Sequence, residues 1–421
     1  MIVRYLYSAC VVIENPDIRI LCDPWFTPGV YDGSWFQWPL VEDSISTIGP
    51  VDLIFISHIH PDHYDPIFLK KYLAAYPDAR IIAGRHAPPI LNAKLAADGF
   101  EFTVVDHCRH GETDIWILPN KTRAVNIDSA LVVRRQDQAV ANLNDCPFDE
   151  PQVETIRALC DGARMMALIP YGGATVHPQA FIFENHDDLV AAGRAKERHF
   201  LDIFHRYIEA LSPDAILPFA GKHWLGGPLM EQNQYRGIPD PVVAAREAGE
   251  RAVVLADGGK ASFDLDTMTA SAVRTEPYDR DEVERYLSQM PFPGYAYERE
   301  LKPDPERELP ILPLLNVALK RARAKTPIAD PCWVIIHATG TELSYVFDVS
   351  SDAPASMRKQ REDFSDLHPR FEIFIDHRYL FGILSRMYHW NNAQIGSHFR
   401  VRRVPDVFRR EIFDFFDFLQ V

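Results

Sequence analysis

Hydrophobic and polar positions alternate in short blocks through the first third of the chain. Apolar runs bounded by turn residues predict strands at 9–14, 18–23 and 52–57. Asp65 and Pro66 follow, and apolar residues then recur at helical spacing. Because aspartate is a preferred N-cap and proline suits the first helical position, this pattern predicts a helix that begins after Asp65.

The pattern continues with strands and helices in mixed order. Further strands are predicted at 80–83, 102–105, 114–118, 129–133, 139–144 and 215–219. Helices are predicted at 150–159 and 187–211. This mixture predicts a layered α/β fold.

A segment rich in proline and charge, 291–313, interrupts the pattern. After it come a predicted helix, a strand pair, a strand and a second helix, at 313–324, 333–338, 343–349, 371–375 and 379–387. We therefore expect a catalytic domain, a linker and a smaller C-terminal α/β appendage, at 1–290, 291–305 and 306–421.

Composition narrows the possible partners. The formal net charge is −15, which disfavours nucleic acid and anionic membrane surfaces as partners, although a local basic pocket for an anionic substrate remains compatible with it. The six cysteines are scattered, with no C-x-x-C pair, which is typical of reduced thiols. No apolar run is long enough to span a bilayer, and we expect a cytoplasmic protein with a small-molecule substrate.

The chemistry is concentrated in the segment that follows the strand predicted at 52–57. His58, His60, Asp62 and His63 lie within six residues, directly after the apolar run 53–56. Buried imidazoles and carboxylates need partners, and at a strand end they can converge on a cation. His58 and His60 could bind one ion, and Asp62 and His63 a second. Imidazole and carboxylate ligands suit zinc or iron.

This H-x-H-x-D-H motif resembles the signature of the metallo-β-lactamase superfamily, as does Leu21-Cys22-Asp23-Pro24-Trp25 upstream. The resemblance implies a four-layer αββα fold. Within the superfamily, the chain is similar to the catalytic part of the CMP-N-acetylneuraminate hydroxylase family. The segments that carry this similarity are Trp35-Phe36-Gln37-Trp38, Asn144-Asp145-Cys146, Pro170-Tyr171-Gly172-Gly173-Ala174, Pro218-Phe219-Ala220-Gly221 and 390–397.

Two departures from that family matter. Its hydroxylases carry a Rieske iron–sulfur domain, whose Cys/His ligand pairs do not occur in this sequence, so an oxygenase would need a separate electron-donor protein or an electron-rich substrate. Relatives also place a further histidine before Asp128. Ala124 and its neighbours offer none, so one metal subsite is incomplete unless Asn126, Asp128 or His110 substitutes.

The resemblance extends the candidate site. It implies that Asp145 bridges two metals, and the strand end before it agrees, whereas the alternative is a turn aspartate. His223 is either the last histidine of the second subsite or a loop histidine near the cleft. Asp62 and His223 are the candidate catalytic residues. Three further residues are candidates for substrate contact: Trp25, Tyr171 and Lys222.

Three functions compete. The first is a non-haem iron oxygenase or hydroxylase that uses one or two iron ions and acts on a sugar nucleotide or another polar biosynthetic intermediate. The second is a hydrolase of a phosphodiester, lactone or amide, in which zinc or manganese activates a water that Asp62 orients. The third is a metal-poor scaffold, which the intact H-x-H-x-D-H motif disfavours. The family resemblance favours the oxygenase.

Overall fold

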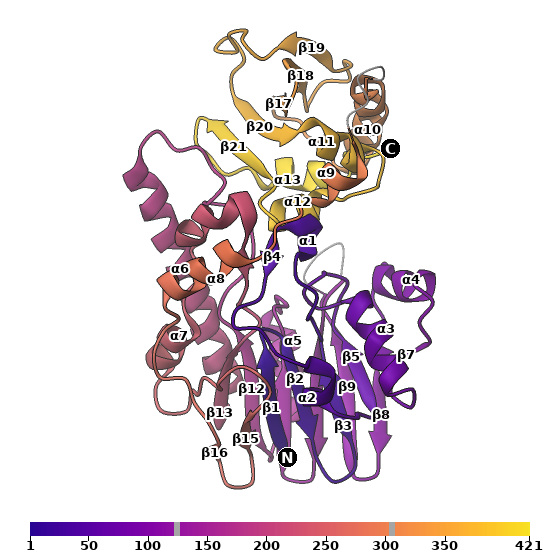
Figure 1. Ribbon diagram of the computed structural model, residues 1–421, viewed down its shortest axis with the longest axis vertical. Helices are drawn as coiled ribbons and strands as arrows, with labels where there is room; N and C mark the ends of the chain where they lie inside the picture. The colour runs from indigo at the N-terminus through magenta and orange to yellow at the C-terminus, as the bar shows by residue number, and fades with distance from the viewer. Residues whose placement is uncertain (122–126, 303–307) are drawn as a thin grey trace.

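The computed structural model describes residues 1–121, 127–302 and 308–421. Within them, strands and helices form a sandwich in the N-terminal part and a separate sheet in the C-terminal part (Figure 1).

The first sheet of the sandwich has eight strands in the order β16-β15-β1-β2-β3-β5-β6-β7. Their bounds in chain order are β1 (Ile2–Tyr7), β2 (Cys10–Glu14), β3 (Arg19–Cys22), β5 (Leu53–Ile56), β6 (Arg80–Ala83), β7 (Phe102–Val104), β15 (Ala261–Asp264) and β16 (Thr269–Ala270). β3, β5, β6 and β7 run parallel. Their carboxyl ends therefore lie at one edge of the sheet.

The second sheet has six strands in the order β13-β12-β11-β10-β9-β8. Their bounds are β8 (His107–His110), β9 (Thr113–Pro119), β10 (Ser129–Arg135), β11 (Gln138–Asn142), β12 (Arg164–Pro170) and β13 (Ala215–Phe219). Here β11, β12 and β13 are parallel, so this sheet too gathers several carboxyl ends at one edge.

Three apolar cores hold the sandwich together. One lies between the sheets and joins residues such as Phe55 and Leu131. A second lies between the first sheet and its outer helices, and a third covers the outer face of the second sheet. The helices of this part are α2 (Ser44–Ile48), α3 (Pro66–Ala75), α4 (Ile90–Ala97), α5 (Glu150–Leu159), α6 (His186–Leu211) and α7 (Pro241–Ala248). The predicted four-layer αββα arrangement is confirmed.

The C-terminal part contains a five-stranded sheet in the order β19-β18-β17-β20-β21. Its elements are α10 (Ile311–Lys325), β17 (Trp333–Thr339), β18 (Leu343–Asp348), β19 (Ser356–Lys359), β20 (Arg370–Asp376), α11 (His377–Leu384), α12 (Trp390–Ile395), β21 (Phe399–Val404) and α13 (Arg410–Asp417). Val176 and Phe181 from the N-terminal part join its apolar core. α9 (Ala296–Glu300) lies within the predicted linker, and the proposed division at 291–305 stays a prediction.

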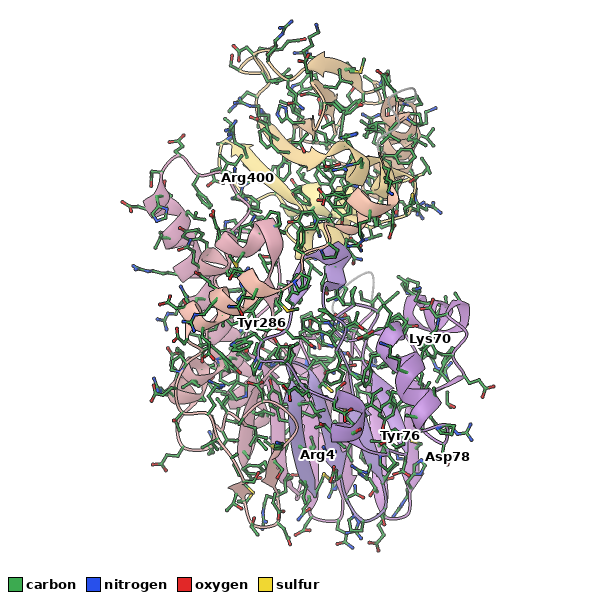
Figure 2. The ribbon with its side chains drawn as sticks, in the orientation of Figure 1. Arg4, Lys70, Tyr76, Asp78, Tyr286 and Arg400 are labelled. Atoms are coloured by element: carbon green, nitrogen blue, oxygen red, sulfur yellow. The ribbon has the colours of Figure 1, made fainter. Side chains whose placement is uncertain are left out.

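Smaller elements connect the two parts. They are α1 (Val30–Gly33), β4 (Trp35–Phe36), β14 (Trp224–Leu225), the 3-10 helix η1 (Gly227–Tyr235) and α8 (Arg280–Gln289). β4 pairs with β14, and α1 contacts α12 at the junction visible in Figure 1. Side chains fill both parts, and in Figure 2 Lys70 marks α3 at the side of the sandwich and Arg400 marks β21 of the C-terminal sheet. None of the described helices is both long and apolar enough to cross a membrane.

Candidate metal centre

The histidine-rich loop begins where β5 ends, and Asp23 fixes its first residue. The Asp23 carboxylate accepts hydrogen bonds from the backbone N–H and the hydroxyl of Ser57, both at 2.7 Å. The N–H groups of His63 and Tyr64 then donate to the His60 carbonyl at 2.9 and 2.8 Å, which turns the chain back. This turn brings His58, His60 and His63 to one side of the loop.

A second set of hydrogen bonds brings Asp145 to the same place. The Ser129 hydroxyl donates to the Ser57 carbonyl at 2.8 Å, and the Asn144 side chain donates to the Ser129 carbonyl at 3.2 Å. Asn144 adopts a left-handed backbone with φ of 54°. This conformation is uncommon outside glycine, although asparagine tolerates it best. The strand ends of both sheets are thus tied together at the candidate site.

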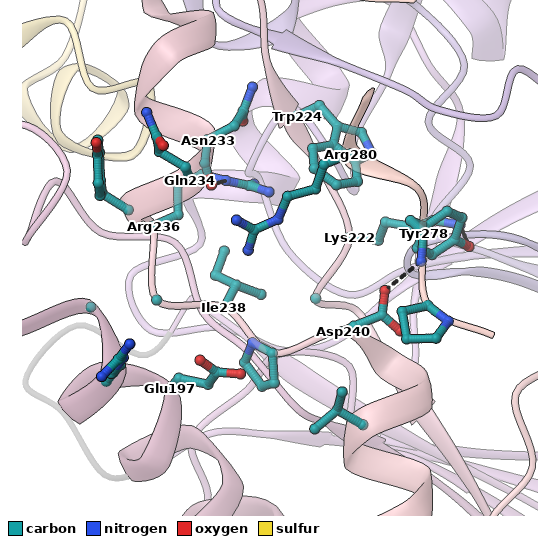
Figure 3. A pocket seen from close by; sticks show the side chains of 18 of the residues that line it. Glu197, Lys222, Trp224, Asn233, Gln234, Arg236, Ile238, Asp240, Tyr278 and Arg280 are labelled. Carbon is teal, nitrogen blue, oxygen red and sulfur yellow. Dashed lines mark hydrogen bonds between the residues drawn. The ribbon is translucent and has the colours of Figure 1, made fainter. Parts of the chain in front are cut away.

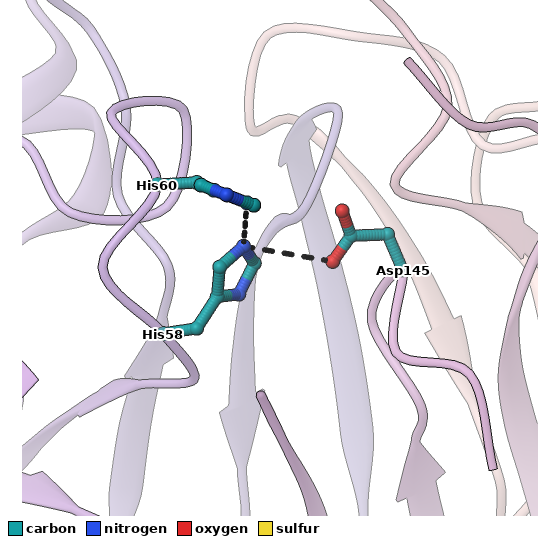
Figure 4. Close-up of side chains that lie close together, drawn as sticks. All are labelled: His58, His60 and Asp145. Atoms are coloured by element: carbon teal, nitrogen blue, oxygen red, sulfur yellow. Dashed lines mark hydrogen bonds and ion pairs between the residues drawn. The ribbon is translucent and has the colours of Figure 1, made fainter. Parts of the chain in front are cut away.

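His58, His60 and Asp145 form the first group of ligand atoms (Figure 4). His58 Nε2 lies 2.8 Å from His60 Nδ1 and 3.9 Å from Asp145 Oδ1. One ligand atom from each of the three residues lies within 4.8 Å of the others. Two imidazoles and a carboxylate at this spacing could surround one ion.

Asp62 and His63 form a second pair around the same aspartate. His63 Nε2 lies 3.5 Å from Asp62 Oδ2 and 3.5 Å from Asp145 Oδ1. Asp145 therefore stands between the two pairs, in the position expected of a bridging carboxylate. The five predicted residues His58, His60, Asp62, His63 and Asp145 all come together.

Burial and neighbouring charges set the protonation of the cluster. Burial and the nearby charge of His63 lower the pKa of His58 to about 4, so its imidazole is neutral near pH 7, as a metal ligand must be. Burial alone would raise the pKa of Asp62, but His63 and His60 hold it well below its usual range. Burial likewise opposes protonation of His63, but Asp145, Asp62 and Asp23 raise its pKa well above normal. His63 is therefore protonated beside these carboxylates, and it would have to release its proton to bind a metal ion.

Two buried atoms test whether a metal fits. Among the described residues, neither His63 Nε2 nor Asp145 Oδ1 has a hydrogen-bond partner. Buried polar atoms are rarely left this way without a reason. Both atoms are metal donors and both face the centre of the group. The residues present thus fit one or two divalent ions.

Three residues contact the candidate ligands although the sequence did not predict this role for them. The Tyr31 hydroxyl donates to Asp62 Oδ1 at 2.6 Å, and Asp23 Oδ2 lies 3.0 Å from His63 Nδ1. Asn391 Oδ1, from α12, lies 2.8 Å from His60 Nε2. Contacts of this kind fix ring orientation and tautomer in metal sites. Asp23 and Asn391 lay within recognised segments, but no local signal indicated their roles.

His223 is not part of the group around Asp145 and stacks on an aromatic ring instead. Its imidazole stacks on Trp35 with ring centroids 3.5 Å apart and planes 1° apart. Asp62 is near enough to act on its pKa, which burial and Arg236 nevertheless lower well below normal. Its role as a ligand stays a prediction. Gly221 permits this loop, because a Cβ there would lie 2.7 Å from the ring of Tyr171.

The predicted substrate residues separate into two groups. Tyr171 and Lys222 line a pocket next to His223. Lys222 is already ion-paired there, with Asp257. Trp25 is 1% exposed and packs against Tyr7 and Trp35 in a buried aromatic cluster.

Two of the candidates for the missing histidine, Asp128 and His110, are described. The charge of Asp128 opposes the lowering of the pKa of His58 and of His60 by burial. His110 is exposed at the hairpin between β8 and β9. In this hairpin the backbone N–H of Glu112 donates to Asp17, which precedes β3, whereas Asp23 follows β3. His110 is therefore no substitute. Ala124 and Asn126 lie outside the described residues.

Comparisons with known proteins agree with this architecture. Residues 2–141 match the family model of the beta-lactamase superfamily domain. The chain is 30% identical over 241 residues to a Mycolicibacterium smegmatis protein named for a Rieske 2Fe-2S iron–sulfur protein, a match that covers 54% of this chain and 45% of that one. It is 26% identical over 231 residues to cytidine monophosphate-N-acetylneuraminic acid hydroxylase of Pan troglodytes, covering 52% and 38%. It thus spans less than half the length of these relatives.

Two solved structures show distant similarity. An isothiocyanate hydrolase from Delia radicum gut bacteria aligns over 63% of this chain and 99% of its own, at 13% identity and a TM-score of 0.44. The diiron beta-hydroxylase CmlA from Streptomyces venezuelae aligns over 61% and 53%, at 15% identity and a TM-score of 0.39.

Proposed function

We propose, from the premise that residues 2–141 form a beta-lactamase superfamily domain, that this chain is a metal-dependent oxygenase acting on a polar small molecule. The observation that carries the proposal is the convergence of His58, His60, Asp62 and His63 on Asp145. The similarity to cytidine monophosphate-N-acetylneuraminic acid hydroxylases favours hydroxylation, and a sugar nucleotide or a related biosynthetic intermediate, over other reactions and substrates.

Each residue would have its own role at the proposed metal centre. His58 and His60 would hold one iron ion, Asp62 and His63 a second, and Asp145 would contribute to both. Bound iron supplies the redox chemistry that dioxygen activation requires. Asp62 stays ionised because histidines surround it, and the Tyr31 hydroxyl fixes its carboxylate. Trp35 stacks on His223, which lines the adjoining pocket.

Electrons would have to come from elsewhere. The sequence contains no Cys/His pairs of the Rieske type, although a similar mycobacterial protein is named for such a cluster. A separate electron-donor protein is therefore part of the proposal.

The second candidate is a metallo-hydrolase with zinc or manganese. The same donor set suits those ions, and hydrolysis needs no electrons. Asp62, ionised and held by Tyr31, would then orient the attacking water.

An experiment can distinguish the two functions by the metal that the chain binds and by whether the reaction requires oxygen. The full chain is purified without added metal, its metals are measured by mass spectrometry, and oxygen uptake is followed with a chemical reductant. We expect iron, and oxygen uptake that depends on it. In His60→Ala the iron content should fall severalfold, whereas His199→Ala, an exposed histidine on α6, should leave it unchanged.

Protein that holds zinc or manganese and cleaves bis(p-nitrophenyl) phosphate under nitrogen would establish the hydrolase. Protein that retains neither iron nor another divalent ion after titration would overturn both functions.

A further inference from the structure

A pocket of about 590 Å³ is lined by His223 and by residues on both sides of it in the chain, Lys222 and Trp224 (Figure 3). Its wall is built from α6, η1, the start of α7 and the start of α8. The volume is within the range of about 300–1,000 Å³ that small-molecule sites occupy.

Positive charge dominates this wall although the whole chain is acidic. Arg194, Arg236 and Arg280 line it, opposed by Glu197 and Asp240. Asp240 is engaged at both oxygens, which accept from the N–H groups of Val242 and Tyr278 at 2.8 and 2.9 Å. The lining as a whole therefore suits an anion.

Arg236 is the centre of this charge. It is 7% exposed, and its guanidinium lies 5.0 Å from the ring of Trp224. Its described hydrogen bonds go to the backbone carbonyls of Asn233 and His223, and no described carboxylate pairs with it. A buried guanidinium without a counterion is costly, so a ligand that supplies the negative charge would be bound strongly.

A second basic side chain, Lys196, lies near Arg236 but is not among the residues that line the pocket. Lys196, on α6, donates from Nζ to the His177 carbonyl at 2.8 Å. Burial and the charge of Arg236 lower the pKa of Lys196 to about 7. Lys222, in contrast, is neutralised by Asp257 and is not available to a ligand. Arg280 is exposed, and in Figure 3 its side chain extends into the pocket.

We propose that this pocket binds a small molecule through an anionic group, a phosphate or a carboxylate, that Arg236 and Arg280 recognise. Guanidinium groups bind both oxyanions through paired N–H donors. Trp224 and the ring of His223 would contact the body of the ligand. The site goes beyond the proposed reaction and does not depend on a metal.

A series of side-chain contacts connects the pocket with the candidate metal centre. His223 stacks on Trp35, the ring of Trp35 lies 4.4 Å from that of Tyr31, and Tyr31 donates to Asp62. These three contacts connect His223, in the wall of the pocket, with Asp62.

The test measures binding of inorganic phosphate and of succinate to the full chain by isothermal titration calorimetry, at constant ionic strength set with chloride. We expect at least one anion to bind, and Arg280→Gln to weaken binding about tenfold or more, as loss of a charge-assisted hydrogen bond predicts. Arg285→Gln, on the same helix but outside the pocket, is the matched control and should change binding less than twofold.

Arg236→Lys provides a second variant that keeps the charge and removes the paired donors, and it too should weaken binding about tenfold. Binding of phosphate alone would assign a phosphate-bearing ligand, and binding of succinate alone a carboxylate. His58→Ala should bind the anion as the unmodified chain does. Three results would overturn the proposal: that neither anion binds, that binding is unchanged in both arginine variants, or that binding is lost only in His58→Ala. None of these results depends on whether iron is found.

Discussion

Asp23, directly after β3, connects that strand with the histidine-rich loop that follows β5. Its carboxylate holds the backbone and hydroxyl of Ser57 and also faces His63 Nδ1. Asp23 itself has a φ of 41°, an uncommon conformation for this residue type. Strained backbone of this kind persists where surrounding contacts over-determine it, and it often marks functional sites.

We expect Asp23→Asn to weaken metal binding about 10–100-fold, the usual cost of losing a carboxylate that orients a metal-bound histidine. The amide keeps the shape of the side chain but loses the charge that faces His63. Competition with a fluorescent chelator measures the affinity.

Asp17→Asn serves as the control, because Asp17 lies beyond the other end of β3 and pairs with Arg135. Its metal affinity should equal that of the unmodified chain. Equal affinity in Asp23→Asn would contradict the role assigned to Asp23.

At the scale of single residues, the candidate ligands that the structure brings together are those whose chemistry is dense in the sequence or follows a predicted strand. Those before residue 64 lie within six positions, and Asp145 follows the strand predicted at 139–144. Tyr31 and Asn391 could not be found in this way. Asn391 lies 331 residues from His60, and a lone asparagine or tyrosine carries no pattern that distinguishes a contact with a metal ligand from ordinary surface chemistry.

At the scale of elements, prediction depended on side-chain type. The helix after Asp65 begins as expected, with Asp65 accepting from the Phe68 N–H at 2.9 Å. β12, a parallel strand between β11 and β13, went unrecognised. Its Arg-Met-Met-Ala-Leu-Ile-Pro sequence is poor in β-branched residues, and a strand buried on both faces shows no alternation.

β20 carries a buried acid whose pairing makes the C-terminal sheet sensitive to pH. Glu372 Oε1 accepts from Arg370 Nε at 2.8 Å, and Oε2 lies 3.3 Å from His337 and 3.4 Å from Arg402. Burial alone would raise the pKa of Glu372, but His337, Arg370 and Arg402 lower it to about 2. The stabilisation is present above the ordinary glutamate pKa of 4.5 and is lost as pH falls from there through about 2.

Glu372→Gln should therefore destabilise the chain by about 2–3 kcal/mol at pH 7, because it removes the buried charge with which Arg370 and Arg402 pair. The difference from the unmodified chain should shrink at pH 3. Urea unfolding at both pH values measures it, with the exposed Glu342→Gln as the control. A difference that is the same at both pH values would falsify the electrostatic explanation.

At the scale of the whole molecule, the two parts meet through specific polar contacts. The Tyr379 hydroxyl of α11 donates to Asp32 of α1, and His398 Nε2 lies 2.7 Å from the Tyr31 carbonyl. The Trp35 indole donates to the Ile395 carbonyl at 3.2 Å. These pairings are invisible in the sequence, because the partners lie more than 340 residues apart.

Asp32 has the opposite pH dependence to Glu372. Burial raises its pKa to about 6, although the hydrogen bond from Tyr379 opposes that change. Because its folded pKa lies above 3.8, stability is greatest below that value and falls as pH rises through about 6.

Tyr379→Phe removes the hydroxyl that donates a hydrogen bond to the ionised carboxylate of Asp32. We expect it to lower the free energy of unfolding by about 1.5–3 kcal/mol at pH 8, the cost of losing a hydrogen bond to a charged group, and by less at pH 5. Denaturant unfolding at both pH values measures this difference. Tyr388→Phe, whose hydroxyl donates to the more exposed Glu300, should cost under about 1 kcal/mol at either pH. A loss that is larger at pH 5 would contradict the assignment.

The contact between Asn391 and His60 links two equilibria. An ion bound at the cluster would favour the placement of His60 that Asn391 supports, and so would favour the docked position of α12. By mass action, metal binding would then protect the last quarter of the chain against denaturants and proteases, and loosening of that segment would release the ion.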